Sequence, residues 1–256
     1  MNRPADKKLV PFAYGFRPFF LLAGIFAALS VFAWLWVYGA GAVPDPRMPP
    51  QFWHAHEMIF GFIAAAIAGF LLTAVPSWTG SRGFSGLPLV VLTALWLAGR
   101  IAFGLGDTLP FGLLAALELA FLPGVMLLVA PSLFRSSNRN ARLLVVLLVL
   151  WAMDAWFLHG IGAGDVAASA AALRGALGLV LVLISVIGGR IVPAFTRNAL
   201  GQSRKDAVIR SYPLVEKLVV PAMLGYAVAD MAAPGGMVTA WVAAFAAALQ
   251  AWRLSG

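Results

Sequence analysis

The sequence predicts an all-α protein, a polytopic transmembrane helical bundle of about eight helices. Three observations support this fold class: 62% of the 256 residues are hydrophobic, the mean hydropathy is +0.90, and only 11% of the residues are charged. A soluble globular domain is nearer half apolar and a quarter charged. The composition therefore excludes a soluble enzyme and a disordered chain. The net charge of +8 does not indicate nucleic-acid binding, because the basic residues lie in short runs between long apolar segments.

The first four predicted spans follow from apolar runs of roughly 20 residues, the length that crosses a bilayer as a helix. They are Phe19–Ala40, Phe52–Val75, Leu87–Leu105 and Leu109–Ala130. Turn residues separate them, and Pro49-Pro50 suits the first turn of the second helix. Ala40-Gly41-Ala42 has the small residues of a signal-peptide cleavage site. The apolar run before it is too long for a signal peptide, so we predict a retained helix.

The last four predicted spans have the same character. They are Leu143–Gly160, Ala171–Val192, Pro213–Met231 and Met237–Trp252. Glycine or proline turns separate most of them, as in Ala233-Pro234-Gly235-Gly236. The longest polar interval, about Arg197 to Tyr212, is the length of a loop and not of a domain. Residues 1–256 are therefore predicted to form a single integral membrane domain.

The distribution of lysine and arginine predicts that both termini are cytoplasmic. With the N-terminus inside, 15 of the 18 basic residues fall in inside segments, and only Arg47, Arg100 and Arg174 fall outside. Cytoplasmic loops carry such an excess in membrane proteins. In this topology His54, His56 and His159, the three histidines of the chain, share the outer membrane face.

The run Trp53-His54-Ala55-His56-Glu57-Met58 is the densest group of metal-ligating residue types. On a helix, His54 shares a face with Glu57 and with the small residues Gly61 and Gly69, which allow a neighbouring helix to approach closely. His56 points the other way, toward a bulky apolar face. An imidazole on such a face suits an axial haem ligand in an apolar slot, and Arg100, at the outer end of its helix, suits a haem propionate. The alternative is that these histidines are ordinary interfacial residues.

Two carboxylates lie deeper in predicted spans. Glu118 is in the fourth span, and Asp154 lies about one and a half turns from His159 in the fifth. Carboxylates inside a membrane usually face the bundle interior or a water path. They could relay protons, pair with Arg100 or Arg174, or form buried hydrogen bonds to neighbouring helices.

Several segments resemble the NnrS family of bacterial membrane proteins. The matching runs are Gly15–Phe20, Trp53–Phe62, Ala68–Gly80, Leu95–Arg100 and Gly188–Pro193, which occur in the expected order. The resemblance implies a haem- and copper-containing polytopic protein linked to nitric oxide and nitrosative stress. Family members usually have about twelve helices, with further histidine motifs beyond the eighth. The chain is therefore expected to be shortened at its C-terminus relative to the family.

The leading interpretation is a haem-binding protein of the bacterial inner membrane, with copper as a further candidate cofactor, involved in the response to nitric oxide and nitrosative stress. The candidate cofactor-binding residues are His54, His56, His159 and Arg100, and the candidate metal ligands are His54, His56, Glu57 and His159. Haem would be non-covalent and b-type, because the chain has no cysteine. The lipid bilayer and haem are the expected partners, copper is a further candidate, nucleic acid is not expected, and the sequence leaves protein partners open.

Two other function classes use histidines or buried carboxylates inside a helical bundle. A haem–copper oxidase needs about six histidines and two haems, so three histidines nearly exclude it. An ion- or proton-coupled transporter using Glu118 and Asp154 is the alternative function. The sequence shows no two similar halves with broken helices, the design common among secondary transporters.

Overall fold

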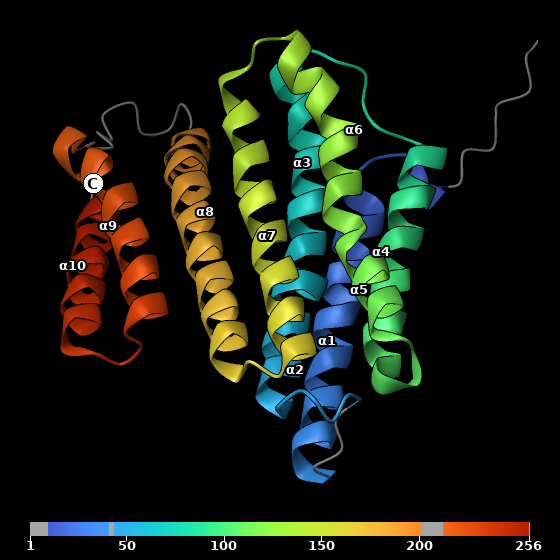
Figure 1. Cartoon of the computed structure of the whole chain (residues 1–256). Coiled ribbons are helices and arrows are strands. Elements are labelled where there is room, and N and C mark those ends of the chain that lie inside the picture. Colours follow the sequence, from blue (N-terminus) through green and yellow to red (C-terminus); the bar gives the residue numbers. More distant parts are fainter. Residues whose placement is uncertain (1–9, 41–43, 201–211, 256) are drawn as a thin grey trace, which may run out of the picture. The chain divides into compact units, whose positions relative to one another are not determined.

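The computed structural model describes residues 10–40, 44–200 and 212–255, and it confirms the predicted helical bundle (Figure 1). The described ranges contain eight continuous helical segments and no strand. They are α1 (Phe16–Ala40); α2 (Pro50–His56), which runs through a π-helical segment (Glu57–Ile63) into α3 (Ala64–Thr79); α4 (Leu87–Leu105); α5 (Phe111–Leu119), which continues after a bend as α6 (Phe121–Arg135); α7 (Arg142–Ala163); α8 (Val166–Leu200); α9 (Pro213–Ala232); and α10 (Met237–Leu254). Short 3-10 turns lie at Val10–Phe12, Gly106–Thr108 and Arg139–Ala141.

Seven of these segments are long and apolar enough to cross a membrane. The segment outside this set is α9, which matches the predicted seventh span but carries Glu216, Lys217 and Asp230 within its 20 residues. Several basic residues behind the predicted orientation lie outside the described residues: Arg3, Lys7, Lys8, Arg204, Lys205 and Arg210.

Local sequence explains where the helices begin and end. Pro50 is the first residue of α2, where a missing backbone N–H costs nothing. Gly80 ends α3 and Gly164 ends α7, both with positive φ (65° and 71°), a conformation that glycine adopts without strain. Asp165 caps α8, because its Oδ1 accepts the backbone N–H of Ala168 at 2.9 Å.

The chain divides into two compact units, Met1–Leu173 and Arg174–Gly256. In the first unit, the continuous segment from α2 to α3 packs against α1, α4 and α6. More than half of its membrane-spanning window is buried (56%), against 17% for α1. The exposed side of α1 is apolar, as Phe32 and Trp36 show, and such a surface suits lipid. Figure 1 shows that α2 begins and α7 ends at the same end of this unit.

The close packing predicted for Gly61 and Gly69 is confirmed. A Cβ at Gly69 would lie 2.9 Å from the ring of Phe20, and a Cβ at Gly61 would collide with the ring of Phe26; both rings belong to α1. Small residues on this face therefore let α1 lie directly against the central segment.

The second unit contains most of α8 together with α9 and α10. Its core between the last two helices is formed by Val215, Val219, Ala222, Ala246 and Leu249. A Cβ at Gly178 of α8 would meet Ala227 of α9, so these two helices also approach closely.

Candidate functional site: a buried ionic network

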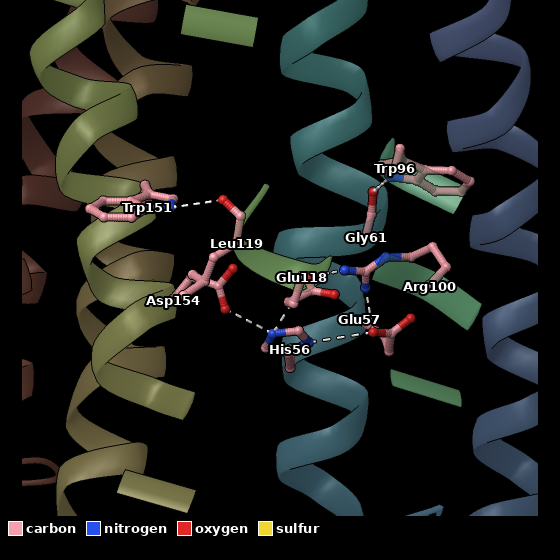
Figure 2. Close-up of polar contacts among 9 residues, drawn as sticks. All are labelled: His56, Glu57, Gly61, Trp96, Arg100, Glu118, Leu119, Trp151 and Asp154. Atoms are coloured by element: carbon pink, nitrogen blue, oxygen red, sulfur yellow. Dashed lines mark hydrogen bonds and ion pairs between the residues drawn. The ribbon is translucent and has the colours of Figure 1, made fainter. Parts of the chain in front are cut away.

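Five ionisable side chains from four helical segments meet inside the first unit (Figure 2). They are His56 of α2, Glu57 of the π-helical segment, Arg100 of α4, Glu118 of α5 and Asp154 of α7. Each is at least nine-tenths enclosed: His56 is 0% exposed, and the three carboxylates are 3–4% exposed. Charged groups are rarely placed inside a membrane protein without a function, so this network is the candidate site.

The π-helical segment begins at the network. His56 is the last residue of α2, and Glu57 is the first residue of the wider turn. Both of these consecutive side chains reach the network, although residues next to each other on an α-helix point about 100° apart. Trp96 of α4 packs beside this turn and donates its indole N–H to the carbonyl of Gly61 at 3.0 Å. Single π turns inside α-helices occur frequently at functional sites.

A proline positions Glu118. Pro123 has no N–H, so the carbonyl of Leu119, four residues earlier, loses its helical partner and the helix bends between α5 and α6. Trp151 of α7 satisfies that carbonyl with its indole N–H at 3.0 Å (Figure 2). Leu119 directly follows Glu118, so this hydrogen bond fixes the carboxylate next to α7, where Asp154 lies.

His56 connects the carboxylates. Its Nε2 lies 2.9 Å from Oδ1 of Asp154 and 3.9 Å from Oε1 of Glu118, and its Nδ1 lies 3.4 Å from Oε1 of Glu57. The ring is held between two phenylalanines, Phe103 (3.9 Å between ring centroids) and Phe157 (4.9 Å). The prediction that His56 faces an apolar surface is therefore correct for the faces of its ring. It is wrong for the nitrogens, which both point at carboxylates.

Arg100 holds the other side of the network. Its guanidinium forms ion pairs with both Glu57 and Glu118. Glycines make room for these groups: a Cβ at Gly99 would lie 2.9 Å from Oε2 of Glu118, and one at Gly61 would lie 3.0 Å from Nη1 of Arg100. The predicted pairing of Glu118 with Arg100 is confirmed. The predicted role of Arg100 toward a haem propionate stays a prediction: two carboxylates already pair with the guanidinium, and its Nε is buried without a hydrogen-bond partner among the described residues.

The network carries more negative than positive charge. It combines three carboxylates, one guanidinium and one imidazole. With all carboxylates ionised, the net charge is −1 when His56 is protonated and −2 when it is neutral. Oε2 of Glu118 is also buried without a hydrogen-bond partner among the described residues. An uncompensated charge in a buried place is costly, so the arrangement favours a further cation.

A metal ion fits three of these side chains. One ligand atom each from His56, Glu118 and Asp154 lies within 4.8 Å of the others, and this is the one such group found in the described ranges. Metals bind imidazole nitrogen and carboxylate oxygen at about 2.0–2.2 Å, so a small inward movement would bring the three atoms onto one ion. Mixed nitrogen and oxygen ligands suit divalent transition metals such as copper or zinc.

Haem does not fit at His56. An axial ligand needs one free ring nitrogen with open space beyond it. Here Nε2 faces Asp154 at hydrogen-bond distance, and phenylalanine rings cover both faces of the imidazole. The residues around His56 therefore suit a single ion and not a macrocycle.

The other predicted ligands lie outside this group. The ring of His54 stacks on Trp34 of α1 at 4.6 Å between centroids, and its Nδ1 is buried without a partner among the described residues. His159 is exposed on α7. Glu57 touches the group through His56 and Arg100. Of the predicted metal ligands His54, His56, Glu57 and His159, only His56 belongs to the three-residue group.

Sequence reasoning named Glu118 and Asp154 but did not place them beside His56. The available signal was a carboxylate in the middle of an otherwise apolar span. That signal shows that a polar partner is needed, but it does not show which helix supplies the partner.

The fold and the network together define a polytopic helical membrane protein with a buried, cation-favouring ionic site. The family model described as NnrS protein matches residues 10–256, nearly the whole chain. The chain therefore belongs to the NnrS family. No curated protein and no solved structure matches it.

Proposed function

We propose that this protein is a metal-binding protein of the bacterial inner membrane that takes part in the response to nitric oxide and nitrosative stress. The link to nitric oxide and the haem and copper content follow from what the NnrS resemblance implies. The observation that carries the metal site is the buried group of His56, Glu118 and Asp154 within an excess of negative charge. We assign copper to this group, because copper accepts mixed imidazole and carboxylate ligands.

Each residue of the network has a distinct task in this proposal. His56, Glu118 and Asp154 hold the ion. Arg100 pairs with Glu118, and Glu57 contacts His56, so these two residues orient the ligands, as groups around a metal site do. The phenylalanines beside His56 keep water away from the site. Copper held by these residues would supply one-electron chemistry.

Haem is the second group that the family implies, and the proposal places it away from His56. The candidate ligand is His54, whose Nδ1 is buried without a partner in the described part of the chain. His159, which is exposed, is a second candidate.

The proposed orientation is the one predicted from the distribution of lysine and arginine, with both termini cytoplasmic.

The test is a metal and haem analysis of protein purified in mild detergent. We expect about one equivalent of copper in the wild type, retained in Glu216→Gln and lost in Glu118→Gln and Asp154→Asn. Glu216 is the matched control, because it is a carboxylate of the second unit. His54→Ala should change the Soret band of bound haem, whereas His56→Ala should remove copper and leave that band in place. Copper retained in both carboxylate variants would refute the metal site.

The role in nitrosative stress has its own test. A bacterial host that lacks its own NnrS protein should grow better under a nitric oxide donor when it expresses the wild type. The benefit should disappear with Asp154→Asn and persist with Glu216→Gln. Equal growth with and without the wild-type protein would contradict this role.

A proton-coupled transporter is the second candidate. The observation in its favour is that His56 lies between Asp154 and Glu118, so three protonatable groups connect α7 to α5. In vesicles this function predicts proton-driven solute uptake that Glu118→Gln abolishes, with no bound copper in the wild type. The metal analysis therefore separates the two candidates.

A further inference from the structure

A cavity of about 770 Å³ lies among α8, α9 and α10 in the second unit. Its lining comes from the end of α8, the start of α9 and the end of α10, so it lies at one end of this unit. Leu181, Ile184 and Met223 contribute an apolar wall. Ile184 is 60% exposed, so this wall continues onto the exposed apolar surface of α8.

Other lining residues are polar, and hydrogen bonds hold the Arg253 side chain in place among them. Arg253 donates from Nε to Glu216 at 2.8 Å and from Nη1 to the carbonyl of Ser185 at 2.8 Å. Arg253 and Glu216 neutralise each other, and among the lining residues, all of them in the described ranges, Arg197 is the one remaining charge. Tyr212 adds a phenolic hydroxyl beside these groups. The polar part therefore carries a net positive charge and a surplus of hydrogen-bond donors.

We propose that this cavity binds an anionic phospholipid. The phosphate would lie at Arg197 and Tyr212, and an acyl chain would lie along Leu181, Ile184 and Met223. An amphiphile is favoured over a free anion because the apolar wall continues onto the exposed surface of α8, a helix long and apolar enough to cross a membrane. The charge of the lining favours a headgroup with net negative charge over a zwitterionic one. This end of the unit is also the predicted cytoplasmic end, where basic residues gather.

A larger side chain at Gly188 should fill the cavity and so test the proposal. It lines the cavity, and a Cβ added there would meet no heavy atom within 4 Å. A phenylalanine at this position should therefore fill the space without disturbing the helix. Gly104 of α4, in the first unit, is equally open and serves as the matched control.

The experiment is native mass spectrometry of the full chain after delipidation and incubation with phosphatidylglycerol or phosphatidylcholine. We expect the wild type to retain phosphatidylglycerol about tenfold better than phosphatidylcholine, the ratio that corresponds to one charged hydrogen bond. Gly188→Phe should abolish this retention, Arg197→Gln should remove the preference for phosphatidylglycerol, and Gly104→Phe should behave like the wild type.

Three results would overturn the proposal. One is equal retention of the two lipids by the wild type. Another is unchanged phosphatidylglycerol binding in Gly188→Phe. The third is displacement of bound phosphatidylglycerol by decylubiquinone at equimolar concentration, which would identify a neutral quinone as the preferred occupant. None of these results depends on the metal content of the network in the first unit.

Discussion

The two units of the chain each contain a group of interacting charges, and the two groups differ in charge balance and in burial. In the first unit, His56 and the carboxylates around it are 0–4% exposed and carry an excess of negative charge. In the second unit, Arg253 forms an ion pair with Glu216, and the Glu216 side chain is 38% exposed. A partly exposed, balanced pair is stable as it is, whereas an enclosed network with excess negative charge favours a proton or another cation. The same residue types therefore have a structural role in one unit and a candidate chemical role in the other.

The largest expected effect comes from removing one arginine from each group. Arg100→Met leaves Glu57 and Glu118 enclosed without their shared guanidinium. Breaking a buried ion pair in this way costs about 3–5 kcal/mol. Arg253→Met should lower the free energy of unfolding by about 1 kcal/mol or less, because the partner of Arg253 is partly solvated. The measurement is SDS-induced unfolding in mixed micelles, and equal losses in the two variants would erase the contrast between the units.

Copper should stabilise one group and not the other. A ligand that binds only the folded state at 100 times its Kd adds about 2.7 kcal/mol to the free energy of unfolding. We expect an increase of this order for the wild type and for Glu216→Gln, and none for Glu118→Gln. The check is thermal unfolding in detergent with and without added copper. A copper-induced increase that persists in Glu118→Gln would assign the ion to another part of the molecule.

The same substitution at two glycines should have opposite signs in the two units. At Gly61 a Cβ would collide with Phe26 and press on Arg100, so Gly61→Ala should destabilise the protein by about 1–3 kcal/mol. At Gly188 the space is open, and Gly188→Ala should stabilise the helix by up to about 1 kcal/mol. SDS titration measures both, and a gain at Gly61 would mean that α1 does not press on the central segment.

The smallest effect is expected at a third ion pair, between the first two spans. Burial alone would raise the pKa of Asp45, but its hydrogen bonds to the side chain and backbone of Arg47 lower that pKa below its ordinary value. The ionised form of Asp45 therefore stabilises the fold above the ordinary carboxyl pKa, and this contribution disappears as the pH falls through the lower folded value.

Asp45→Asn should accordingly cost about 0.5–1 kcal/mol at pH 7, a small loss because Arg47 is partly exposed. The difference between the wild type and the variant should shrink as the pH falls below the ordinary carboxyl pKa. Unfolding curves at pH 7 and pH 3 test this, and a difference that grows toward acid would show that the sign is wrong.

Much of the fold could be predicted because membrane helices follow from apolar length. The predicted span Leu87–Leu105 coincides with α4, and Pro213–Met231 differs from α9 by one residue. Hydrocarbon thickness sets that length, so the pattern of each span is sufficient by itself. Small residues such as Gly69 also predicted a tight helix contact, and the partner proved to be α1.

The site could be predicted only in part. His56 was singled out for its apolar face, but the ligands beside it, Glu118 and Asp154, come from helices far along the chain. Helical periodicity describes one helix at a time and does not say which helices are neighbours. The change from α- to π-helix at Glu57 also alters the direction of the following side chains, and no residue type in that stretch predicts this change.

The order in which the chain is made gives the ionic network a further consequence. His56 and Glu57 enter the membrane early, but Arg100 is made 43 residues after Glu57 and Asp154 is made 98 residues after His56. Until then the growing chain carries buried charges without all of their partners, which is costly inside a membrane. Release of this segment from the insertion machinery into lipid should therefore wait for α7. The network thus links membrane integration of the first unit to the completion of its fifth crossing.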